Sequence, residues 1–138
     1  APDPDTTITD PSTTLLPISV SAYDAENGSL YIHSSRGYTR SGEIKPELAA
    51  PGVGISAVAK NGSLTSVTGT SAAAALTAGA AALLVDWRLE GNPRHLMTSS
   101  ELKNFLIRGA GRSRDLTYPN RSWGYGTLNV YGVFESLL

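Results

Sequence analysis

The feature that most constrains this chain is a long apolar segment from Ser71 to about Leu89. It contains no proline, alanine is its commonest residue, and apolar side chains occupy every face of a helical wheel. A helix of this kind is usually buried on all sides. The segment therefore predicts a central helix that needs other elements packed around it.

The start of this helix carries the residue arrangement with the clearest chemistry. Ser71 follows a glycine-containing turn and opens the helix. Its hydroxyl is therefore expected beside unpaired backbone N–H groups and the positive end of the helix dipole. Both stabilise an oxyanion that forms when a serine attacks a carbonyl group. The same residues also fit a structural helix cap, so the segment alone leaves both interpretations open.

The rest of the pattern indicates an α/β fold with a mostly parallel sheet. Thr98 and Glu101 stand in the capping-box relation and predict a second, amphipathic helix that ends at Gly109. Residues 123–138 predict a glycine-rich turn and a short closing element. Apolar segments bounded by turn residues predict strands at 15–23, 29–35, 47–50, 55–59 and 64–67.

Composition predicts one globular unit over residues 1–138, because 41% of the residues are hydrophobic and 17% are charged. Residues 1–12 are expected to form a flexible lead-in, and their Pro, Asp and Thr content does not fit a signal peptide. The net charge of -1 comes without runs of one sign, which argues against a nucleic acid or a membrane surface as partner. The apolar segment 72–85 is expected to be too short to span a bilayer.

Three segments in the same order resemble motifs of the subtilase family, the subtilisin-like serine proteases or peptidase S8 family. Lys45 to Val53 resembles its Lys-Pro-Asp-[Leu/Ile]-x-Ala-Pro-Gly-Val strand and turn, and Gly124 to Val130 resembles its closing segment. Ala75 and Leu76 depart from the proline and histidine that are usual in the nucleophile motif. The residues that agree with that motif are Gly69, Thr70, Ser71, Ala73, Ala74, Ala78 and Gly79.

This resemblance implies a C-terminal portion of a subtilisin-like three-layer α/β fold, about half of a catalytic domain, with a buried central helix starting at Ser71. It implies that Ser71 is the nucleophile and that its backbone N–H belongs to the oxyanion hole. Gly69, Thr70, Ala73 and Gly79 would support that motif. Residues 29–40 resemble subtilases of clostridia and related Firmicutes, including a spore-germination branch.

The other two members of a Ser-His-Asp triad are missing from this sequence. The family's Asp-[Ser/Thr]-Gly and His-Gly-Thr motifs do not occur in it. His33 and His95 are interpreted as solvated side chains, Asp24 as a turn residue, and Asp86 as lying about four helical turns from Ser71. We therefore expect a bacterial serine endopeptidase whose fragment is inactive alone, or alternatively a pseudoprotease that serves as a binding or regulatory scaffold.

Expected partners follow from the same reasoning. They are a peptide or protein substrate, the remainder of the catalytic domain, and a second copy when the fragment stands alone, because half a sheet leaves a bare edge. No cofactor is expected, no residues have metal-ligand spacing, and a calcium ion, which some subtilases carry, cannot be located. The absence of cysteine leaves the compartment open, while the resemblance implies a secreted, cell-envelope or spore-associated protein.

Overall fold

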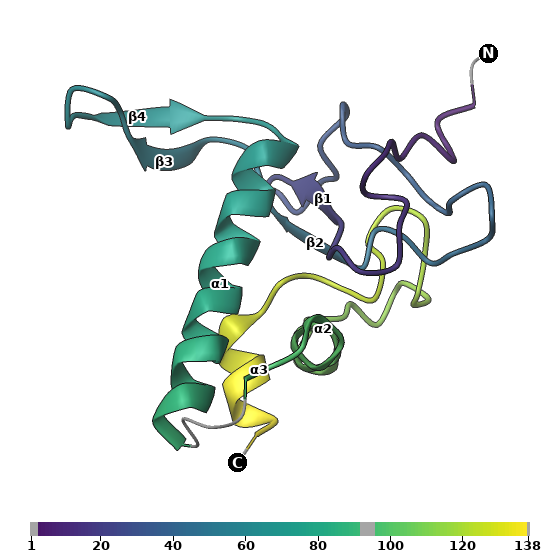
Figure 1. Ribbon diagram of the computed structural model, residues 1–138. Coiled ribbons are helices and arrows are strands. Elements are labelled where there is room, and N and C mark those ends of the chain that lie inside the picture. Colours follow the sequence, from purple (N-terminus) through teal and green to yellow (C-terminus); the bar gives the residue numbers. More distant parts are fainter. Residues whose placement is uncertain (1–2, 92–95, 138) are drawn as a thin grey trace.

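The computed structural model describes residues 3–91 and 96–137. Figure 1 shows α1 along one side of the molecule, with the β3–β4 hairpin projecting from near its first turn and α3 beside its last turns. The elements are, in chain order, β1 (Val20–Tyr23), β2 (Leu48–Pro51), β3 (Ile55–Val58), β4 (Leu64–Val67), α1 (Thr70–Gly91), α2 (Ser99–Arg108) and α3 (Val130–Glu135).

The strands form two separate pairs. β1 and β2 are parallel, in a register that sets Val20 opposite Leu48, and α1 packs against both. β3 and β4 are antiparallel, and the predicted Asn61-Gly62 turn joins them. A helix packed on a parallel pair confirms the α/β class.

Two small clusters form the core. The larger one joins β2 to all three helices through Leu48, Leu84, Leu106, Ala110 and Val133. The smaller one contains only alanines, Ala22, Ala50 and Ala73, and it lies where the first turn of α1 meets the sheet. Because alanine side chains are short, the helix start lies close to both strands.

The expectation that the apolar helix is buried on all sides is wrong for this chain. Its buried residues form one stripe at helical spacing, Ala73, Thr77, Ala80 and Leu84. Leu76 and Leu83 on neighbouring faces are 41% and 56% exposed, so this chain covers only one side of α1.

The helix is also longer than the sequence suggested. It has 22 residues, which is long and apolar enough to cross a membrane by length and composition alone. This finding corrects the expectation that the apolar segment is too short to span a bilayer. Core helices of water-soluble proteins meet the same criteria, so this finding is weak evidence for a membrane span.

Residues 29–35 do not form the predicted strand. Leu30 makes one bridge with Tyr23, and the segment then turns back along β1. The Tyr31 N–H donates to the Ala22 carbonyl at 2.9 Å, and the Ala22 N–H donates to the Ser34 hydroxyl at 3.0 Å. The outer edge of β1 is therefore not bare at Ala22, contrary to the expectation for half a sheet.

The strand predicted over residues 15–23 forms only in its second half, at Val20–Tyr23, and residues 15–17 are exposed. The lead-in before it makes contacts with later segments. The N–H groups of Thr6 and Thr7 donate to the carbonyls of Gly37 and Arg36, at 3.2 and 2.9 Å. The flexibility of residues 1–12 stays a prediction.

The C-terminal elements agree with the local sequence signals. The capping box is confirmed, because the Glu101 N–H donates to the Thr98 hydroxyl and the Thr98 N–H donates to the Glu101 carboxylate. The closing element is α3, whose first turn is capped by the Asn129 side chain, which accepts from the Gly132 N–H at 3.0 Å.

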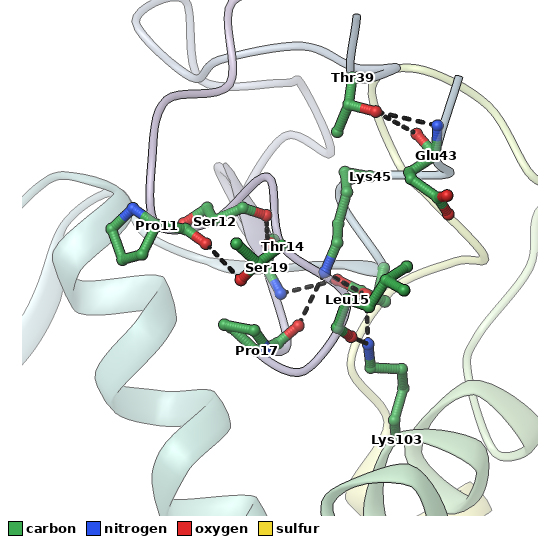
Figure 2. A network of polar contacts seen from close by, with 11 residues as sticks. Pro11, Ser12, Thr14, Leu15, Pro17, Ser19, Thr39, Glu43, Lys45 and Lys103 are labelled. Atoms are coloured by element: carbon green, nitrogen blue, oxygen red, sulfur yellow. Dashed lines mark hydrogen bonds and ion pairs between the residues drawn. The ribbon is translucent and has the colours of Figure 1, made fainter. Parts of the chain in front are cut away.

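A buried charge cluster fixes the loop before β1. Lys45 and Glu47 are almost fully buried, and the Glu47 carboxylate accepts from Lys45 at 2.6 Å and from Lys103 of α2 at 2.7 Å. It also accepts from the Ser19 N–H at 2.7 Å. Figure 2 shows the two lysine ammonium groups converging on this point, where Lys45 also donates to the Pro17 carbonyl at 2.7 Å. Three segments distant in sequence therefore meet at one carboxylate.

Candidate active site

Ser71 is the second residue of α1, and it is exposed. The turn before it is formed by Gly69, whose φ of 150° is rarely adopted by residues with a side chain. The Gly69 carbonyl accepts from the N–H groups of Ala72 and Ala73 and so starts the helix. The hydroxyl consequently lies at the positive end of a 22-residue helix, two residues after Gly69.

A chain of backbone hydrogen bonds ties this turn to the sheet. The Gly52 N–H donates to the Tyr23 carbonyl at the end of β1, at 2.9 Å. The Gly69 N–H donates in turn to the Gly52 carbonyl at 2.7 Å. The Thr68 hydroxyl adds a second link by accepting from the Gly54 N–H at 2.9 Å. The position of Ser71 is thus set by the carboxyl ends of β1 and β2.

In the described part of the chain, no base is hydrogen-bonded to Ser71. Within residues 3–91 and 96–137 the Ser71 hydroxyl has no hydrogen-bond partner. His33 lies in a turn with its ring against Tyr31, at 5.3 Å between ring centres. Asp24 accepts from the Glu26 N–H and from the Asn27 side chain, as a turn residue does. His95 lies outside the described residues.

Asp86 also lies far from the hydroxyl. It is on α1 and exposed, fifteen residues after Ser71 (86 − 71), which corresponds to roughly 22 Å along the helix axis. Among the described residues no group of three or more metal-binding side chains occurs. Among the described residues, the site therefore consists of a serine hydroxyl and a backbone N–H at a helix start, with no histidine or carboxylate bonded to the hydroxyl.

Among the described residues, Tyr23 at the end of β1 is the titratable group whose pKa departs from its ordinary value. Its ring packs against Trp123 at 5.5 Å between ring centres, and burial raises the pKa of its phenol. Since the phenol stays protonated at neutral pH, Tyr23 does not replace the missing base.

These observations together define a serine held at a helix start by the ends of parallel strands. The sequence profile of the subtilase family matches residues 2–126. The chain belongs to the subtilase family. No match is found among curated protein sequences.

Solved subtilases show the same architecture. The CspB protease of Clostridium perfringens has 33% sequence identity and a TM-score of 0.91, over 99% of this chain and 30% of that chain. The prenylagaramide maturation protease PagA has 25% identity and a TM-score of 0.78, over 99% of this chain and 48% of that one. The patellamide maturation protease PatA has 26% identity and a TM-score of 0.73, over 92% of this chain and 45% of that one. The chain spans about a third to a half of the length of these proteases.

The comparisons confirm the subtilase resemblance, and the clostridial neighbour fits the branch suggested by residues 29–40. The structure brings Gly69, Thr70, Ser71 and Ala73 together at the start of α1, while Gly79 lies further along the helix with open space beside it. Their roles in this subtilase stay predictions. The contact between Gly52 and Gly69 is not predicted from the sequence, although both glycines lie in segments that resemble subtilase motifs. No local pattern signals a contact across that interval.

Proposed function

We propose that this subtilase chain is the C-terminal part of the catalytic domain of a serine endopeptidase, in which Ser71 is the nucleophile. The carrying observation is the exposed Ser71 hydroxyl at the start of α1, inside the Gly-Thr-Ser motif of a chain that belongs to this family. The substrate would be a peptide or a protein.

The chemistry assigns defined tasks to the residues of this chain. The Ser71 oxygen attacks the carbonyl carbon of the scissile bond while a histidine outside this chain takes its proton. The oxyanion that results is stabilised by the Ser71 N–H and by a donor outside this chain. Collapse breaks the C–N bond, the histidine protonates the leaving amine, and water then hydrolyses the acyl-enzyme.

The rest of the domain is the partner that this mechanism needs. It would supply the histidine and aspartate, and it would cover the open side of α1, where Leu76 and Leu83 are exposed. The chain spans at most 48% of the solved proteases described above, which leaves room for such a partner. We infer that the fragment alone is inactive, because losing the triad histidine costs roughly a million-fold in turnover.

The second candidate is a pseudoprotease that uses the same fold as a binding or regulatory scaffold. The absence of a base for Ser71 among the described residues is compatible with it. The two proposals separate on the sequence of the remaining domain: intact Asp-[Ser/Thr]-Gly and His-Gly-Thr motifs support the enzyme, and loss of either supports the scaffold.

Labelling with a fluorophosphonate, which reacts with activated serines, tests the proposal. We expect the longer protease that contains this chain to be labelled, and Ser71→Ala to abolish the labelling, because the variant lacks the oxygen that reacts with the probe. Ser66→Ala is the matched control, because Ser66 is exposed on β4 and should not affect the reaction. Labelling that survives in Ser71→Ala contradicts the nucleophile assignment, and Ser71-dependent labelling of the 138-residue chain alone contradicts its inactivity.

A further inference from the structure

Gly52 lies in the narrowest space around the nucleophile turn. A Cβ atom placed on it would come within 2.6 Å of the Ala22 Cβ, 2.9 Å of the Gly69 carbonyl oxygen and 3.4 Å of the Ala73 Cβ. These three residues belong to β1, to the turn before Ser71 and to the first turns of α1. A side chain at position 52 would therefore press on all the elements that place the hydroxyl.

The requirement for glycine at this position is steric. Gly52 is not among the glycines with a left-handed φ, whereas Gly54, two residues later, has a φ of 65° and open space around it. Any residue could adopt the backbone of Gly52, but only glycine fits between Ala22 and the turn. The short distance between β1 and the start of α1 thus depends on the absence of a Cβ atom at position 52.

We propose that Gly52 is a positioning residue for Ser71, which it places by letting the nucleophile turn lie directly on the end of β1. This inference rests on the proposed function of Ser71. Gly52 acts through two routes: its carbonyl accepts from the Gly69 N–H at 2.7 Å, and its missing side chain leaves Ala22 and Ala73 free to pack.

The geometry gives the size of the expected effect. Carbon atoms that are not bonded pack at about 3.5 to 4.0 Å, so a methyl group at position 52 must move by roughly 1 Å relative to Ala22. A displacement of about 1 Å in a catalytic constellation can lower the rate by about 100-fold. Because the contact lies behind the turn, substrate binding should change little.

The test compares kcat and KM of the longer protease with those of its Gly52→Ala variant. We expect kcat to fall by about 10- to 100-fold while KM stays within about twofold, the pattern of an interaction made in the transition state. Gly91→Ala is the matched control, because a Cβ there meets nothing within 4 Å, and it should leave both constants unchanged. A Gly52→Ala enzyme with unchanged kcat overturns the proposal.

A rescue experiment separates positioning from general destabilisation. Ala22→Gly removes the Cβ atom at 2.6 Å and leaves the contact with the Gly69 carbonyl at 2.9 Å. The double variant should therefore have a kcat roughly tenfold higher than that of Gly52→Ala alone. If Gly52→Ala alone does not fold, the double variant should fold and show the reduced kcat. Failure of the double variant to recover either folding or turnover counts against the proposal.

Ser71→Ala in the same assay distinguishes failure of the nucleophile assignment from failure of the positioning role of Gly52. Turnover that survives Ser71→Ala removes the nucleophile assignment itself. Turnover that is lost with Ser71→Ala but unchanged with Gly52→Ala removes only the positioning role.

Discussion

The two sides of α1 differ in what this chain provides for them. We call the stripe of Ala73, Thr77, Ala80 and Leu84 the covered face, because it packs on the sheet and the other helices. We call the stripe of Leu76, Gly79 and Leu83 the open face, because these residues are exposed. Leu84 is 1% exposed and its neighbour Leu83 is 56% exposed, although both are leucines in the same helix.

This difference separates the part of the fold that the chain can stabilise by itself from the part that needs a partner. The covered face stabilises the chain through burial of apolar surface. The open face offers the same kind of side chains without anything to bury them. If the rest of a subtilase domain covers the open face, substitutions there should matter in the longer protease and hardly at all in the isolated chain.

The largest effect is expected on the covered face. Leu84→Ala should lower the free energy of unfolding of the isolated chain by about 2–5 kcal/mol, because it leaves a cavity among Leu48, Leu106 and Val133. Leu83→Ala is the matched control, and at concentrations where the chain is monomeric it should change the free energy of unfolding by no more than about 0.5 kcal/mol. Urea denaturation measures both. Equal losses for the two leucines would show that the open face is already covered in solution.

A smaller effect is expected on self-association. Since β1 is capped at Ala22, two isolated chains should associate through the open face rather than through the sheet edge. The double variant Leu76→Glu/Leu83→Glu should weaken association at least about tenfold, or about 1.4 kcal/mol, in sedimentation experiments. Ile32→Glu, at a side chain that is 84% exposed in another region, should leave it unchanged. A compact wild-type monomer at high concentration would contradict this prediction.

The smallest expected effect is the change in stability caused by Gly79→Ala, whose sign depends on whether the rest of the domain is present. Gly79→Ala should stabilise the isolated chain by about 0.5–1 kcal/mol, because glycine is unfavourable within a helix and a Cβ at this position meets nothing within 4 Å. In the longer protease the covering elements should remove this gain or reverse it. Thermal or urea denaturation of both proteins measures the difference, and an equal gain in both would mean that Gly79 stays uncovered.

Local signals were sufficient where the structure depends on neighbours in sequence. Thr98 and Glu101 correctly predicted the start of α2, and Asn61-Gly62 correctly predicted the turn between β3 and β4. Both predictions succeed because capping and turn formation involve residues only two or three positions apart. The Gly-Thr-Ser segment likewise predicted a helix that begins beside Ser71.

Long-range contacts decided what the sequence could not show. Residues 15–17 are not part of a strand, because the carbonyls of Leu15 and Pro17 accept from the side chains of Lys103 and Lys45 instead of from a neighbouring strand. Residues 29–35 turn back on β1 for a similar reason, with Ser34 bonded to Ala22. The composition of α1 predicted a helix covered on every side. It could not indicate that this chain covers only one side of the helix.

The buried carboxylate of Glu47 has a consequence for how the chain responds to salt. Dissolved ions weaken attractions between charges that face water and act much less on charges shielded from it. The junction of Lys45, Glu47 and Lys103 belongs to the second kind, whereas the pair of Asp5 and Arg121, at 3.5 Å, is partly open to solvent on both sides. Concentrated electrolyte would therefore weaken the attraction between Asp5 and Arg121, while the loop before β1 keeps its place.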